Sequence, residues 1–206
     1  MNELLVSDES VFSSFNKKIE EIDKYISQSS SKIYIGGLRY SSRAFFLARL
    51  AQSISRTVIV LTSNHKTAER LIGDLKYFSD FINFDKKISF FPSWEIHPYE
   101  NISPPLKIMG ERLEVLRMCQ RKEVSLLVVP VQSIMQCVIP RQELDDRTFS
   151  IKSGENFEHE FLETCLVDNG FVRSSLVEER GHFSVRGDIV DFYPPTSTNP
   201  LRIEFF

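Results

Sequence analysis

Short β-branched segments alternate with helical segments over the first two thirds of this 206-residue chain, and this alternation constrains the fold more than any other feature. The expected helices include Phe12–Ile26, whose apolar residues follow helical spacing, and a segment from Ala68 to Phe78 that Asn64 can cap. Strand–helix alternation of this length is typical of a parallel sheet, so we predict an α/β domain over residues 1–145. Its expected strands are Ile33–Gly36, Val58–Leu61, Ile88–Phe91 and Leu126–Val129.

The second of these strands, Val58–Leu61, is continuously apolar, which is typical of a strand buried on both faces. The strand Ile88–Phe91 leads into a proline-rich loop, and the segment from Leu106 to Cys119 has helical character. The polar stretch Pro140–Arg147 indicates a domain boundary near residue 145.

Beyond that boundary the pattern changes to one amphipathic helix followed by alternating strands. The helix is expected over Glu155–Asp168, with Gly170 in the position that ends a helix. Further on, Leu201, Ile203 and Phe205 alternate with Arg202, Glu204 and Phe206, after a turn over residues 194–200. We therefore predict a second, small α+β domain over residues 146–206 with an antiparallel sheet.

The charge of the chain argues against non-specific binding to nucleic acid. The 25 basic and 28 acidic residues give a net charge of −3, and residues 151–206 hold five basic and ten acidic residues. The three cysteines form no Cys-x-x-Cys pair and show no zinc-ligand spacing with the four histidines, so we expect buried, inert thiols in a reducing compartment and no metal site. The longest aliphatic run is too short to span a bilayer and no signal peptide is evident, so we expect a cytoplasmic protein.

The turn after the first expected strand has the architecture of a phosphate-binding loop without its chemistry. Such a loop needs G-x-x-x-x-G-K-[ST]. Gly36 and Gly37 are present, but Ser42, Arg43 and Ala44 stand where the second glycine, the lysine and the metal-binding hydroxyl are required. We interpret the turn as a degenerate phosphate loop, not expected to function, and predict no catalytic residue and no cofactor for the chain.

The loop over residues 91–100 contains Trp94, the single tryptophan, together with Tyr99 and several acids. Stacking of these rings on single-stranded bases is one hypothesis. The other is that Trp94 and Tyr99 attach the loop to the domain, which the acidic neighbours favour. A nucleotide- or DNA-handling domain that uses the Gly36–Gly37 turn and the Trp94 loop is thus the alternative function.

On the second domain, the alternation places Arg202, Glu204 and Phe206 on one face, and Arg186 on the polar face of a neighbouring strand. Arginine and aromatic side chains are enriched where proteins bind proteins. From the pattern alone, a protein-binding surface and an ordinary charged face remain equally open.

A resemblance to a known family bears on this choice. Residues 180–194 (RGHFSVRGDIVDFYP) and 201–206 (LRIEFF) resemble the DNA-clamping subunit of the excision nuclease and, still more, the bacterial transcription–repair coupling factor. Residues 91–95 (FPSWE), Arg112–Leu113 and residues 128–136 (VVPVQSIMQ) are similar to the coupling factor specifically. The resemblance covers nearly the whole chain and is weakest over the first eighty residues.

The resemblance implies a helicase-like first domain and a second domain that binds another protein of nucleotide excision repair, the damage-recognition subunit of the excision nuclease. The family's contact residues fall on Arg186, Arg202 and Phe206. The resemblance also implies that the chain is a fragment of a longer protein of this family, the parent protein, which is an ATP-driven DNA translocase that displaces stalled RNA polymerase. ATP, magnesium, RNA polymerase and DNA would be bound by domains that this chain lacks.

Two departures from the family pattern limit what is carried over. The loop from Pro92 to Pro105 is much shorter than the Tyr-rich hairpin of the DNA-clamping subunit, so damage clamping is not expected. The chain ends at Phe206, so we expect the second domain to be truncated at its C-terminal end. A structural or autoinhibitory role toward the parent's other domains is a further alternative.

Overall fold

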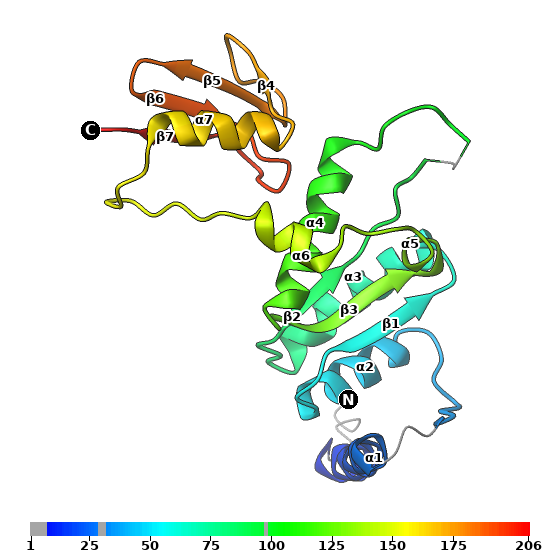
Figure 1. Cartoon of the computed structure of the whole chain (residues 1–206). Coiled ribbons are helices and arrows are strands. Elements are labelled where there is room, and N and C mark those ends of the chain that lie inside the picture. Colours follow the sequence, from blue (N-terminus) through cyan, green and yellow to red (C-terminus); the bar gives the residue numbers. More distant parts are fainter. Residues whose placement is uncertain (1–7, 29–31, 97–98) are drawn as a thin grey trace, which may run out of the picture. The chain divides into compact units, whose positions relative to one another are not determined.

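The computed structural model describes residues 8–28, 32–96 and 99–206 (Figure 1). The chain forms two compact units. The first contains the chain up to Phe90 and the returning segment Lys122–Pro130, and the second contains Phe91–Arg121 and Val131–Phe206. This division differs from the one suggested by the sequence pattern, and the boundary near residue 145 stays a prediction.

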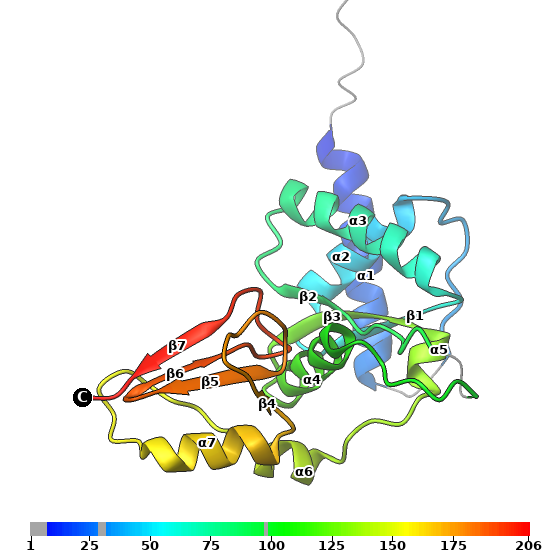
Figure 2. The same cartoon turned by 90° about the horizontal axis from the view of Figure 1, so that it is seen from above.

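The first unit is built on a three-stranded parallel sheet, as predicted. Its strands have the spatial order β1-β3-β2, with β3 (Val124–Pro130) between β1 (Val58–Thr62) and β2 (Lys87–Phe90). Figure 2 shows α2 (Ser42–Ser53) and α3 (His65–Phe81) on one side of this sheet. The core between them is dominated by small and branched side chains: Ala44, Ala48, Ala51, Ala68, Leu75, Phe84, Leu126 and Val128.

Local signals position these helices. The Asn64 side chain accepts a hydrogen bond from the Thr67 backbone N–H at 2.9 Å, which confirms its predicted capping of α3.

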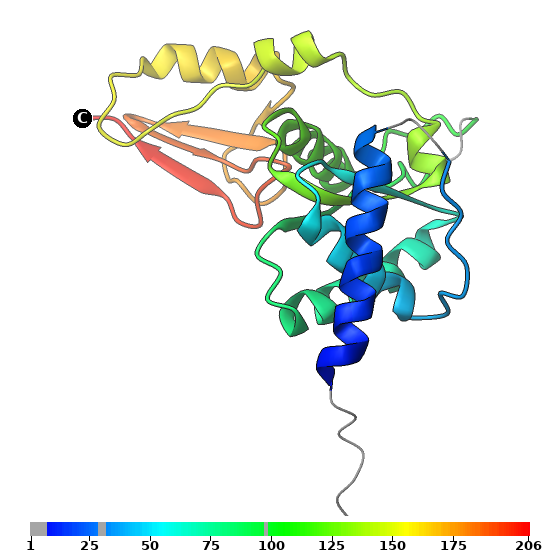
Figure 3. The same cartoon turned by 90° about the horizontal axis from the view of Figure 1, so that it is seen from below.

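The first helix, α1 (Asp8–Gln28), packs on α2 (Figure 3). Ile19 on its inner face is buried against Phe46 and Leu50. The apolar stripe of the first segment therefore covers another helix.

Two strand predictions for this unit are wrong. Residues 33–36 form no strand, and Tyr34 is 92% exposed. Four β-favouring residues make a strand only if they pair with a neighbour, and these residues pair with neither sheet. The strand β1 is not buried on both faces, because Ile59 and Leu61 are more than half exposed. It lies at the edge of the sheet and pairs only with β3.

Within its described residues, the second unit contains four helices and a four-stranded sheet. Its helices are α4 (Leu106–Gln120), α5 (Val131–Ile134), α6 (Arg141–Asp146) and α7 (His159–Asp168). Its strands, in spatial order, are β4 (Val172–Arg173), β5 (His182–Arg186), β6 (Ile189–Phe192) and β7 (Leu201–Glu204).

The predicted antiparallel sheet is corrected to a mixed one. The three strands β5, β6 and β7 are antiparallel neighbours, but β4 is parallel to β5. A tight hairpin would reverse the chain, whereas residues 174–181 lead it back to start β5 in the same direction as β4. The two-residue strand β4 is too short for its alternation to be recognised in the sequence.

The helix α7 lies along one face of this sheet (Figures 2 and 3). Leu162 and Leu166 of α7 are buried against Phe183 and Val190 of the sheet. The helix begins four residues later than predicted, and Phe157, before its start, also packs on this core. Its end is as predicted: Gly170 has a φ of 81°, in the left-handed region where glycine is favoured.

Glycine also matters inside α4. A Cβ built on Gly110 would lie 2.4 Å from the backbone carbon and oxygen of Pro195, in the loop between β6 and β7. Only a residue without a side chain permits this close approach.

None of the helices in the described residues combines the length and the apolar character needed to cross a membrane.

Candidate functional site

The strand register of the second unit determines which residues share the face opposite α7. Ser184, Asp191 and Arg202 are direct partners across β5, β6 and β7. A second row, two residues further along each strand, contains Arg186, Ile189 and Glu204. We call these six residues the open face. The predicted separation of Arg202 and Glu204 from the apolar face is confirmed, because Ile203 packs into the core under α7.

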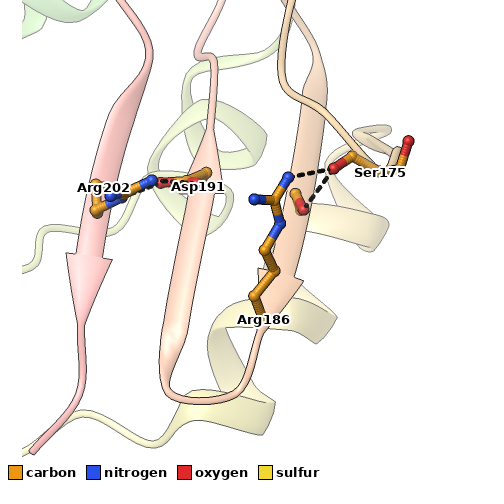
Figure 4. Close-up of polar contacts among 5 residues, drawn as sticks. Ser175, Arg186, Asp191 and Arg202 are labelled. Atoms are coloured by element: carbon orange, nitrogen blue, oxygen red, sulfur yellow. Dashed lines mark hydrogen bonds and ion pairs between the residues drawn. The ribbon is translucent and has the colours of Figure 1, made fainter.

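Arg202 and Asp191 form an ion pair with two hydrogen bonds on this face (Figure 4). The Nε of Arg202 donates to Oδ1 of Asp191 at 2.7 Å, and Nη2 donates to Oδ2 at 2.9 Å. The hydrogen bonds from Arg202 lower the pKa of the Asp191 carboxyl, against a smaller opposing effect of burial; the charges of Arg202 and Arg186 add to the lowering. The same hydrogen bonds raise the pKa of Arg202.

The second arginine of the open face is held by a backbone carbonyl. Nη2 of Arg186 donates to the Ser175 oxygen at 2.6 Å, and the hydroxyl of Ser184 donates to the same oxygen at 3.5 Å (Figure 4). These residues, with Arg173 and Ser174, line a shallow depression beside β5. Both predicted arginines therefore lie on the open face with defined partners.

Phe206 follows the end of β7 and is fully exposed. The backbone N–H of Phe205 bonds to the Asp188 oxygen at 2.8 Å, which continues the pairing of the strands by one residue. The Phe205 ring packs into the core and lies edge-on to His159, with 5.0 Å between ring centroids. The opposite environments of the two phenylalanines agree with the predicted alternation. That Arg186, Arg202 and Phe206 bind a partner stays a prediction.

Sequence reasoning missed Asp191 as part of this surface. The signal was present in the alternation of residues 189–192, where Asp191 is the polar member of an apolar strand. What the pattern does not provide is the register, which places Asp191 directly opposite Arg202.

The Trp94 loop packs against a buried cation, Arg112 of α4, whose burial the sequence did not reveal. The Arg112 guanidinium, on α4, lies 4.1 Å from the Phe91 ring centroid and 4.2 Å from that of Trp94. Arg112 is 1% exposed, and its Nη1 donates to the Pro92 oxygen at 2.6 Å and to Gln136 Oε1 at 3.3 Å. Burial lowers the pKa of Arg112 to about 10.

These contacts support the interpretation that Trp94 attaches its loop to the fold. The backbone N–H of Trp94 also donates to Gln136 Oε1 at 3.0 Å. For Tyr99 the same interpretation is wrong, because this side chain is 97% exposed. The described part of the chain therefore leaves the Tyr99 ring almost entirely in contact with solvent.

The turn interpreted as a degenerate phosphate loop is exposed, and its polar groups bond within the turn. Gly37 has a φ of 83°, and Nε of Arg43 donates to the Leu38 carbonyl oxygen at 3.2 Å. Ala44 is fully buried in the core under α2. The identification with a phosphate loop stays a prediction, as does the helicase-like character of the first unit.

The described residues contain no group of three or more His, Cys, Asp or Glu side chains that could hold a metal ion. Cys119 and Cys165 are partly buried and burial raises the pKa of both thiols, with the charge of Asp168 adding to the effect at Cys165. Cys137 is exposed, so the prediction of a buried thiol is wrong for this residue.

Comparison with known proteins agrees with the resemblance seen in the motifs. Residues 149–206 match the family described as the UvrB interaction domain. This match contains the whole of the open face. It also ends at Phe206, the last residue of the chain.

Over most of its length the chain is similar to transcription-repair-coupling factors. It is 30% identical over 172 residues to the one from Bacillus subtilis strain 168, 29% over 182 residues to that of Myxococcus xanthus and 28% over 172 residues to that of Escherichia coli K12. These alignments cover 84%, 87% and 84% of the chain, but only 14%, 15% and 14% of the relatives. The chain therefore spans about one seventh of the length of the curated relatives it matches, and the predicted resemblance is confirmed.

Proposed function

We propose that this chain is a non-catalytic recruitment module of a transcription-coupled DNA repair factor and that its open face binds the damage-recognition subunit of the excision nuclease. The observation that carries the proposal is the placement of Arg186 and Arg202. They come from different strands of the sheet, lie on the face that α7 leaves uncovered, and belong to the segment that matches the UvrB interaction domain.

The chemistry of this surface suits a partner that presents carboxylates beside an apolar pocket. A guanidinium presents planar N–H pairs that match a carboxylate, so Arg186 and Arg202 would pair with acids of the partner. The exposed ring of Phe206 would fill the apolar pocket. Truncation of such an anchor typically weakens binding about tenfold or more.

The proposal requires neither a nucleotide nor a metal in this chain. Ser42 and Ala44 stand where a working phosphate loop needs a glycine and a metal-binding hydroxyl. ATP, magnesium, DNA and RNA polymerase belong in the proposal to the parent protein, which would use them through domains outside this chain.

Calorimetric titration with the purified damage-recognition protein tests the proposal. We expect the wild-type chain to bind, the Arg186→Ala/Arg202→Ala variant to lose binding while it still unfolds cooperatively, and Phe206→Ala to bind about tenfold more weakly or worse.

Arg147→Ala is the matched control, because Arg147 is a similarly exposed, ion-paired arginine that follows α6 and does not lie on the open face. It should bind like the wild type. Equal binding by the double variant and the wild type would place the interface elsewhere. Failure of the wild-type chain to bind would contradict the recruitment function of this chain.

A further inference from the structure

The ion pair on the open face leaves one edge of Arg202 unused. A guanidinium carries five N–H donors, and Asp191 accepts from Nε and from one N–H of Nη2. One N–H of Nη1 and the second N–H of Nη2 form the other edge, a second parallel pair of donors. Among the contacts of the described residues, that edge has no acceptor. Arg202 is therefore paired within the chain and still able to bind a second carboxylate with two parallel hydrogen bonds.

Burial differs between the two partners in a way that fits this arrangement. The Asp191 side chain is 20% exposed and the Arg202 side chain is 58% exposed. The carboxylate is thus the more buried member of the pair, and the Arg202 guanidinium points toward it from the neighbouring strand (Figure 4). The nearby charge of Arg186 also favours the ionised form of Asp191, because it adds to the lowering of the pKa of this carboxyl.

We propose that Asp191 is a positioning residue for the open face. It fixes the guanidinium of Arg202 so that the free edge of this guanidinium meets a carboxylate of the partner. This inference rests on the proposed function. An exposed arginine that moves freely must be ordered when a partner binds, at a typical cost that corresponds to about 2- to 12-fold in affinity. The pair with Asp191 restricts Arg202 before the partner arrives.

An opposite role for Asp191 would be that of a competitor, which occupies Arg202 and repels acidic partners. The geometry favours positioning, because a partner carboxylate can bind the free edge without breaking either hydrogen bond to Asp191. The two roles predict opposite signs: removal of Asp191 weakens binding if it positions Arg202 and strengthens binding if it competes.

A double-mutant cycle measured by surface plasmon resonance, with the damage-recognition protein immobilised, separates these roles. Its variants are Asp191→Ala, Arg202→Lys and the two combined, since lysine keeps the charge but lacks the planar edge that Asp191 holds. We expect Asp191→Ala to weaken binding about 2- to 12-fold in the wild-type background and to have a clearly smaller effect beside Arg202→Lys.

Glu143→Ala is the matched control, because Glu143 of α6 is also an acid paired with an arginine, Arg147, and neither residue lies on the open face. It should not weaken binding. If Asp191→Ala is too unstable, Asp191→Asn replaces it, and melting temperatures identify variants that are folded.

Unchanged or tighter binding by Asp191→Ala overturns the inference while leaving the recruitment function intact. An equal loss in both backgrounds also overturns it, because Asp191 would then act on the fold in general rather than through Arg202. If Arg202→Lys itself binds like the wild type, Arg202 is not a contact, and both the site assignment and this inference fail.

Discussion

The guanidinium of Arg112 lies 4.2 Å from the ring centroid of Trp94, so a cation from α4 covers one face of the single tryptophan. The same guanidinium lies 4.1 Å from the Phe91 ring centroid, so one cation contacts both rings. A ring covered by a cation has one face fewer to offer to a nucleic-acid base. This arrangement weighs against the use of the Trp94 loop for binding DNA.

Replacing Arg112 by alanine should destabilise the fold by about 2–4 kcal/mol, because the contacts with the Phe91 and Trp94 rings are lost and the carbonyl of Pro92 loses its donor. Trp94 fluorescence reports the change directly, and its emission should shift toward that of an exposed tryptophan. Lys107→Ala, on the same helix but exposed, should leave both the emission and the denaturation midpoint unchanged. A native emission spectrum in Arg112→Ala would contradict this assignment.

Substitution of two helical glycines by alanine should have opposite effects. Gly110→Ala introduces a Cβ 2.4 Å from the Pro195 backbone and should destabilise the fold by about 1–3 kcal/mol. Gly73→Ala, in α3, meets nothing within 4 Å and should stabilise the fold by about 0.5–1 kcal/mol through helix propensity. Chemical denaturation of both variants tests this, and the prediction fails if Gly110→Ala is as stable as the wild type.

The carboxyl of Asp191 should titrate below its ordinary pKa of 3.8, because Arg202 donates two hydrogen bonds to its charged form. Since the folded pKa is lowered, the pair stabilises the fold above pH 3.8 and this contribution is lost as the pH falls through the lower folded pKa.

Carbon-detected NMR titration measures the pKa of Asp191 directly. Arg202→Ala should raise it more than Arg186→Ala does, since the hydrogen bonds from Arg202 are the largest cause of the shift. The reverse order of the two effects would show that the ion pair does not form in solution.

ATP with magnesium should leave the melting temperature of the chain unchanged. A ligand that binds only the folded state raises the melting temperature with its concentration, whereas a ligand that does not bind gives no shift. Arg43, the residue in place of the phosphate-binding lysine, bonds back to the Leu38 carbonyl. A saturable rise in melting temperature would favour the alternative function as a nucleotide-handling domain.

The sequence predicted the elements whose signals are local. The apolar spacing of α1 and α4, the cap at Asn64 and the left-handed Gly170 each depend on residues within a few positions of one another. The alternation along β7 likewise separated Arg202 from Ile203 before any register was known.

The features that were predicted wrongly or missed are those that depend on residues far apart along the chain. Ile33 and Ile35 have strand propensity, but no neighbouring strand pairs with them. The direction of β4 depends on the path of the loop that joins it to β5, and the partner of Asp191 depends on register. Arg112 was part of a motif in the sequence, yet its burial against the rings of Phe91 and Trp94 requires a helix and a loop that are separated along the chain.

The central position of β3 in the parallel sheet has a consequence for the order in which the chain can fold during synthesis. Residues 58–62 and 87–90 leave the ribosome first, but each pairs with residues 124–130 and not with the other. The nascent chain must therefore expose two unpaired strands until residues 124–130 have also been made. During that interval, premature pairing between ribosome-bound chains is a hazard, and a chaperone that shields β1 and β2 would increase the yield of folded protein.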